Sequence, residues 1–165
     1  MKGNAIRLGD DINTDLIIAG RHKFRAVTIE EMAKHIFEDI DPTLHSRIKP
    51  GDIIVAGKNF GCGSSREQAP RVILAAGISA VIAKSFARIF FRNAINVGLP
   101  ALTVSGEFID STSTGDVIEI DLKEGVVKNL TKNLETRFKP FPRQLLDILE
   151  AGGLVPFVKK RGLDI

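Results

Sequence analysis

The stretch GDIIVAGKNFGCGSSREQAPRVILAAGISAVIAK, residues 51–84, decides the fold class of this chain. It begins in a turn, and the short apolar run IIVAG that follows is typical of a strand buried on both faces. A glycine- and serine-rich turn then leads into residues 66–76, where apolar side chains recur at helical spacing until Gly77 stops the helix. The run ISAVIAK repeats the buried-strand pattern. This order of strand, turn, helix and strand predicts an α/β fold.

The residues after this stretch continue the same alternation. We expect Ser85 to cap a helix over residues 86–96 that Gly98 ends, followed by a strand over residues 99–104. The segments GDVIEIDL (115–122) and GVVKNL (125–130) predict a hairpin. PRQLLDILEAGG (142–153) predicts a last helix.

The residues before the stretch predict a strand over 5–8, a turn in GDDINTD, an apolar run at 16–19 and a basic loop, GRHKFRAV, at 20–27. Thr28 and Glu31 have the spacing of a capping box, which predicts a helix from there to the Asp41-Pro42 pair. No internal repeat, low-complexity segment or linker interrupts the chain. We therefore expect one domain over residues 1–165.

Composition limits the classes of function. The 165 residues are 44% apolar and 26% charged, and no run approaches the roughly 20 apolar residues of a membrane span. The opening MKGNAIRLGDD lacks the apolar core of a secretory signal, so we expect a cytoplasmic protein without a membrane partner. The net charge of +3 is spread along the chain, and Trp and Tyr are absent, which favours a small acidic substrate over a nucleic acid.

Cys62 is the single cysteine of the chain. One cysteine forms no internal disulfide and cannot hold an iron-sulfur cluster or a zinc ion by thiolates alone, so we expect this chain to bind no metal. A helix N-terminus can lower the pKa of a nearby thiol, but no partner base for Cys62 is visible. A role in packing or in a tight turn is favoured over a nucleophile.

The turn NFGCGSSREQAP, residues 59–70, contains two serines that both fit a capping box. Ser64 stands three residues before Glu67, and Ser65 three residues before Gln68. Only one serine can cap the helix, and we expect it to be Ser65. The hydroxyl of Ser64 is then left free in the turn.

The same turn has the features of an anion site. Ligands of α/β sheets gather beyond the carboxyl ends of strands, where a helix N-terminus presents unpaired N–H groups. Gly61 and Gly63 permit close backbone approach, and Arg66 supplies a planar fork for a carboxylate. The turn matches neither a phosphate-binding loop nor a nucleophile elbow.

The three histidines, His22, His35 and His45, have no placement that pairs them with Ser64 in a catalytic triad. His35 lies between apolar positions of the expected helix after Thr28. We therefore expect it to be structural.

Four segments, taken in order, resemble the small subunits of 3-isopropylmalate dehydratases, which are the separate swivel-domain chains of the aconitase family. The resemblance covers nearly the whole chain, and GSSRE together with KSFARIFFRNAIN is its most specific part. The segments are DDINTDLII (10–18), GDIIVAGKNFGCGSSREQAP (51–70), AVIAKSFARIFFRNAINVGLPAL (80–102) and LEAGGLVPFVKKR (149–161).

The resemblance implies a fold, an activity and a partner. It implies a swivelling β/β/α domain that closes over a large subunit, which carries a 4Fe-4S cluster on its own cysteines. It implies a hydro-lyase of leucine biosynthesis that converts 2-isopropylmalate into 3-isopropylmalate by losing and regaining water. The open iron of the cluster would act as a Lewis acid on the dicarboxylate substrate.

The resemblance also implies residue roles. The first serine of the GSSRE motif is the family's base, which corresponds to Ser64, and the motif's arginine corresponds to Arg66. Gly63 and Ser65 fall within the same substrate-binding motif. A further substrate arginine belongs to the loop at residues 20–27, where Arg25 is the best match and Arg21 is the rival.

The loop GRHKFRAV leaves the substrate open, because it is strongly basic and departs from the family's usual Tyr-Leu pattern. Homocitrate, citrate and 2,3-dimethylmalate are alternatives for the same chemistry. An alternative of another class is a module that binds an anion or RNA without catalysis.

Overall fold

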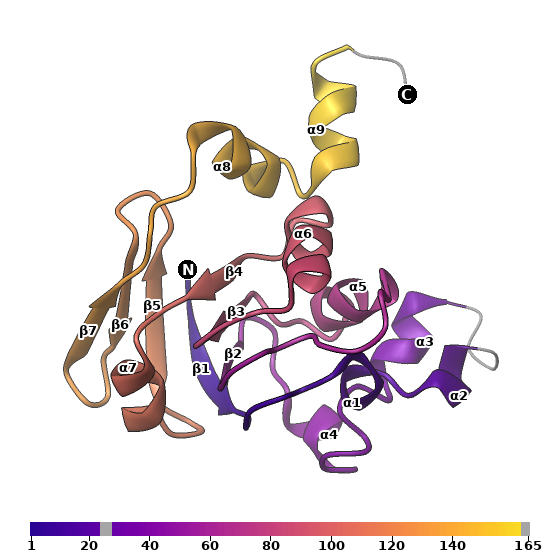
Figure 1. The fold of residues 1–165 in the computed structure, drawn as a ribbon, viewed down its shortest axis with the longest axis horizontal. Coiled ribbons are helices and arrows are strands. Elements are labelled where there is room, and N and C mark those ends of the chain that lie inside the picture. The colour runs from indigo at the N-terminus through magenta and orange to yellow at the C-terminus, as the bar shows by residue number, and fades with distance from the viewer. Residues whose placement is uncertain (24–27, 163–165) are drawn as a thin grey trace.

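The computed structural model describes residues 1–23 and 28–162, and their strands form one seven-stranded sheet in the order β4-β3-β2-β1-β5-β6-β7 (Figure 1). The strands are β1 (Lys2–Arg7), β2 (Ile53–Ala56), β3 (Ala80–Ala83), β4 (Ala101–Thr103), β5 (Val117–Asp121), β6 (Val126–Asn129) and β7 (Leu134–Arg137). The helices are α1 (Thr14–Ile17), α2 (Gly20–Lys23), α3 (Ile29–Ala33), α4 (Leu44–Arg47), α5 (Gln68–Ala75), α6 (Arg88–Asn96), α7 (Gly106–Ser111), α8 (Arg143–Glu150) and α9 (Leu154–Lys160).

The strands β1 to β4 run parallel, and helices connect them. Helix α5 leads from β2 to β3, and α6 leads from β3 to β4, so the α/β prediction is confirmed. Every residue of β2 and β3 is buried, because one face of these strands packs under the helices and the other against the antiparallel half. The apolar runs of the sequence are therefore explained by burial on both faces.

The strands β5, β6 and β7 form an antiparallel meander beside β1 (Figure 1). The expected hairpin is confirmed as β5 and β6, with Ile120 opposite Val127. A second core of buried side chains lies between this half of the sheet, α7 and the opposite face of β2 and β3. Neither β7 nor α7 was expected from the sequence; the residues of β7, LETR, include one apolar side chain.

Two further sequence predictions were wrong near the chain's helices. The helix that the capping box of Thr28 and Glu31 begins ends at Ala33, well before Asp41. The chain leaves the helix because Phe37 takes a φ of 57° and its N–H donates to the carbonyl oxygen of Ile17 at 3.0 Å. Phe37 is fully buried, so core packing overrides the helical pattern.

The end of the chain also differs from the prediction, because α8 is followed by another helix, α9. Two consecutive glycines at positive φ, Gly152 and Gly153, turn the chain between them. Helix α8 packs on α6 through Ile148 and Leu149, which form a third apolar cluster with Ile95. In the described residues, no helix has the length and apolar character to cross a membrane.

Candidate functional site

The turn that follows β2 and the segment that follows β1 lie side by side at the carboxyl ends of the parallel strands. The N–H of Gly61 donates to the carbonyl oxygen of Ile12 at 2.7 Å, and the N–H of Thr14 donates to that of Cys62 at 2.9 Å. The Thr14 hydroxyl donates to the carbonyl oxygen of Ser64 at 3.1 Å. The two segments therefore form one unit at the place where ligands of α/β sheets bind.

The segment after β3 forms the other wall of this unit. The N–H of Phe60 donates to the carbonyl oxygen of Ser85 at 3.0 Å, and the Phe60 ring packs edge-on against Phe90 of α6 with 5.1 Å between centroids. Gly61 has a φ of +78°, and a Cβ atom there would lie 2.1 Å from Phe90. This close approach requires glycine at position 61.

Ser85 does not cap α6, contrary to the prediction. That helix begins at Arg88, and its N-cap Ala87 makes no side-chain cap. The Ser85 hydroxyl instead accepts a hydrogen bond from the N–H of Asn59 at 2.8 Å. Ser85 thus fixes the loop after β2, which holds the GSSRE turn in place.

Neither serine of the GSSRE turn caps α5, so the prediction that Ser65 is the cap was wrong. The helix begins at Gln68, and its N-cap Glu67 is already helical with no side-chain cap. The chain turns earlier through a backbone hydrogen bond from the N–H of Arg66 to the carbonyl oxygen of Ser64 at 2.8 Å. The serines therefore lie before the helix, where no side-chain cap is formed.

Both serine side chains face solvent. Ser64 and Ser65 are exposed, as is Gly63, and within residues 1–23 and 28–162 neither hydroxyl has a hydrogen-bond partner. The first turn of α5 offers few N–H groups, because Pro70 has none and the N–H of Ala69 donates to the carbonyl oxygen of Arg66 at 3.3 Å. Any anion bound here depends on side chains more than on the helix N-terminus.

Arg66 lies across the turn toward α1. Its Nη1 donates to the carbonyl oxygen of Ile18 at 2.9 Å, and its Nη2 lies 2.6 Å from Oδ1 of Asp15. The Arg66 side chain is 19% exposed, whereas that of Asp15 is 58% exposed. One edge of the guanidinium is thus anchored to the backbone, and the other is paired with a carboxylate that water also reaches.

The start of the basic loop lies next to this arginine. A Cβ atom at Gly20, the first residue of α2, would be 3.4 Å from Nη2 of Arg66. The first residues of the expected loop form the short helix α2, and Arg25 lies outside the described residues. The fold therefore brings the loop's first residue to the GSSRE turn.

Arg21, the rival of Arg25, is already paired in the structure. Its guanidinium makes hydrogen bonds with Asp39 and Glu38, and these bonds raise its pKa above the ordinary value. Arg21 thus points to the turns that follow α3.

Cys62 lacks the signs of an activated nucleophile. The side chain is partly buried, and burial together with the nearby charge of Asp11 raises the pKa of its thiol. A raised pKa keeps the thiol protonated near neutral pH. Cys62 serves the turn through its backbone, whose carbonyl oxygen accepts the hydrogen bond from Thr14.

Sequence reasoning missed Asp15 as the partner of Arg66 and the grouping of His22 and His35 with Glu38. His22 lies 3.1 Å from the Glu38 carboxylate, and His35 lies 2.6 Å from it. The motif DDINTDLII contains Asp15, but nothing in its spacing identifies Arg66 as its partner. The pairs of Arg66 with Asp15 and of His22 with Glu38 join residues that are distant in the sequence, whereas His35 and Glu38 are three residues apart.

Comparisons with known proteins agree on one family. The model of the aconitase C-terminal domain family matches residues 17–107. The 3-isopropylmalate dehydratase small subunit 2 of Archaeoglobus fulgidus is 56% identical over 98% of this chain and 96% of its own. The small subunit 1 of Thermotoga maritima is 51% identical over 98% of this chain and 96% of its own.

A solved structure shows the same fold. The crystal structure of 3-isopropylmalate dehydratase from Methanocaldococcus jannaschii is 47% identical, covers 98% of this chain and 94% of its own, and aligns with a TM-score of 0.90. Together with the family match over more than half of the chain, this agreement settles the family. The chain belongs to the aconitase C-terminal domain family, among the small subunits of 3-isopropylmalate dehydratases.

Proposed function

We propose that this chain is the small subunit of a 3-isopropylmalate dehydratase, a hydro-lyase of leucine biosynthesis that converts 2-isopropylmalate into 3-isopropylmalate. The observation that carries the proposal is an exposed GSSRE turn at the carboxyl ends of parallel strands, in a chain that matches such small subunits over 98% of its length. A cytoplasmic location suits a chain with one unpaired cysteine.

The exposed turn is half of a site. Ser64 and Ser65 face solvent beside Arg66, and a buried substrate pocket requires a second wall. We propose that a large subunit supplies this wall and carries the 4Fe-4S cluster, because this chain has one cysteine and the pKa of its thiol is raised. The cluster supplies a Lewis acid for the substrate hydroxyl and a carboxylate.

In this proposal Ser64 is the base of the reaction. Its Oγ takes the proton from the carbon beside a carboxylate, while hydroxide leaves the neighbouring carbon and a double bond forms. Return of the proton and of hydroxide, together one water, with their positions exchanged gives the isomer. A serine hydroxyl is a poor base near neutral pH, so the alkoxide depends on the positive charge of Arg66 and on the exclusion of water by the large subunit.

Arg66 has the geometry to bind a substrate carboxylate. Its Nη1 is held by the carbonyl oxygen of Ile18, while Nη2 pairs with the exposed Asp15. An ion pair with an exposed partner contributes little free energy, so a substrate carboxylate can replace Asp15 at modest cost. A guanidinium fork binds a carboxylate through two parallel hydrogen bonds.

A panel of substrates tests the proposed function. The chain mixed with a matching large subunit is expected to convert 2-isopropylmalate faster than homocitrate, citrate or 2,3-dimethylmalate, and to be inactive without that subunit. Formation of the unsaturated intermediate is followed by its ultraviolet absorbance. Faster conversion of another diacid would support the proposed reaction type but overturn 2-isopropylmalate as the substrate. If no diacid is converted, the proposed function is wrong.

Arg25→Ala is expected to change substrate binding without changing assembly. We propose that Arg25 contacts a substrate carboxylate, because the loop that contains it begins beside Arg66. Loss of one charged hydrogen bond predicts a rise in KM of about 10- to 100-fold. The measurement is KM for each diacid of the panel, with Arg47→Ala, an exposed arginine of α4, as the control. Unchanged kinetics in Arg25→Ala would exclude this contact.

A further inference from the structure

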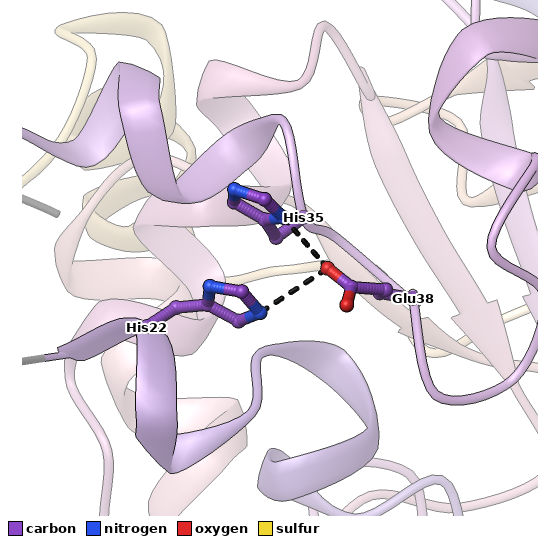
Figure 2. A group of neighbouring side chains, drawn as sticks. All are labelled: His22, His35 and Glu38. Atoms are coloured by element: carbon purple, nitrogen blue, oxygen red, sulfur yellow. Dashed lines mark hydrogen bonds and ion pairs between the residues drawn. The ribbon is translucent and has the colours of Figure 1, made fainter. Parts of the chain in front are cut away.

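His22, His35 and Glu38 converge outside the GSSRE turn (Figure 2). His22 lies on α2, and the other two lie in the turns that follow α3. Nδ1 of His35 is 2.6 Å from Oε2 of Glu38, and Nε2 of His22 is 3.1 Å from the same oxygen. The three ligand atoms lie within 4.8 Å of one another.

The His22 ring nitrogen is buried and lacks a hydrogen bond. His22 is 9% exposed, and its Nε2 has no hydrogen-bond partner among the described residues although Oε2 of Glu38 is close. A buried polar nitrogen without a hydrogen-bond partner costs free energy unless a ligand binds it.

The Glu38 carboxylate is oriented by an outer partner. Nη2 of Arg21 donates to Oε1 of Glu38 at 3.1 Å, which leaves Oε2 facing the two rings. Partners of this kind orient the ligands of many metal sites. Figure 2 shows both ring nitrogens aimed at the same carboxylate oxygen.

We propose that His22, His35 and Glu38 form a binding site for a divalent transition metal ion of the zinc class. Two imidazole nitrogens and one carboxylate oxygen are a common zinc ligand set, with water in the fourth position. Such ligands also suit nickel and copper, whereas magnesium and calcium prefer sets made of oxygen alone. The proposal does not depend on the proposed enzymatic function.

Binding requires a small rearrangement. Ligand atoms about 2.0–2.1 Å from a tetrahedral zinc ion lie about 3.3 Å from each other, so the present separations of 2.6 and 3.1 Å must widen by less than about 1 Å. The rings are stacked with centroids 3.9 Å apart and planes at 12°, so they must also tilt to converge on one ion. The side chain of His35 is 45% exposed, which gives it room to turn.

The ion would join two parts of the chain. Helix α2 starts the loop that we propose contacts the substrate, and the turns after α3 are held in the core by Phe37. A metal ion bound to His22 from the first and to His35 and Glu38 from the second would fix α2 in place. Metal binding to the folded state also stabilises it, because the unfolded chain lacks the site.

The test uses the untagged, metal-stripped chain by itself. Calorimetric titration with Zn²⁺ is expected to give one ion per chain, and Co²⁺ is expected to give visible absorption bands of a four-coordinate ion. At free Zn²⁺ about 100 times Kd, Tm is expected to rise by about 5 °C or more, with no rise in Mg²⁺. Absence of binding by the wild-type chain overturns the proposal.

Variants then place the ion. His22→Ala and Glu38→Gln are each expected to weaken Zn²⁺ binding at least 100-fold. Glu38→Gln keeps the shape of the side chain, so it still tests the site if His22→Ala fails to fold. His45→Ala removes an exposed histidine and Cys62→Ser removes the single thiol, and both are expected to bind like the wild type. Wild-type binding by Glu38→Gln, or loss of binding in either control, would assign the ion to a different place.

Discussion

Ser64→Ala is expected to lower kcat of the enzyme reconstituted with its large subunit by about 10²- to 10⁴-fold. The change removes the proposed base, and neither the backbone nor a water molecule would hold an oxygen fixed at the position of Oγ. Ser64 is exposed, and its hydroxyl has no partner in the part of the chain that the structure describes. The change therefore leaves the stability of this chain and its assembly unaffected, so the loss falls on turnover.

Three measurements distinguish the base from a merely structural serine. Size-exclusion chromatography checks assembly, denaturant unfolding checks stability, and exchange of the substrate C–H proton with solvent isolates the proton-transfer step. Ser46→Ala, an exposed serine whose hydroxyl donates to Thr43, is the control and is expected to be fully active. Ser65→Ala is expected to raise KM with a smaller effect on kcat. If Ser64→Ala keeps wild-type turnover, Ser64 is not the base, and the role of the turn is limited to binding an anion.

Arg66→Ala is expected to lower kcat/KM by about 10²- to 10³-fold. Arg66 is the cationic residue of the GSSRE motif, and its side chain supplies the proposed fork for a substrate carboxylate. Arg66→Lys is expected to recover only part of the activity, because an ammonium group cannot bond Ile18 and a carboxylate with the same planar geometry. Steady-state kinetics of both variants on 2-isopropylmalate measure these effects.

Asp15→Ala separates a catalytic role of Arg66 from a positioning one. This change removes the partner at 2.6 Å but leaves the bond from Arg66 to Ile18. Because Asp15 is 58% exposed, the stability lost is at most about 1 kcal/mol. We expect near-normal kcat, with KM unchanged or lower because a competitor of the substrate is gone. A loss as large as that of Arg66→Ala would show that the Asp15 pair positions Arg66 and that substrate contact is not its main role.

The errors of sequence interpretation have a common physical origin. Ser65 and Ser85 both have the residue type and position of helix caps, yet neither caps. Ser85 instead accepts from the N–H of Asn59 in the loop after β2, and Ser65 lies in a turn that precedes the start of α5 at Gln68. The helix after Thr28 stops early because burial of Phe37 outweighs the local pattern. Local spacing predicts which hydrogen bonds a side chain can make. The packing of neighbouring segments decides which of these hydrogen bonds form.

The sequence by itself determined the α/β alternation, because apolar runs must be buried and glycines such as Gly77 and Gly98 readily take the positive φ that ends a helix. It also determined the family and the absence of a thiolate set for a metal cluster. Only the tertiary structure decided the pairing of Arg66 with Asp15 and the meeting of His22 with Glu38. These contacts join segments that follow different strands or helices. The distance between such segments depends on tertiary packing, which cannot be predicted from a local sequence pattern.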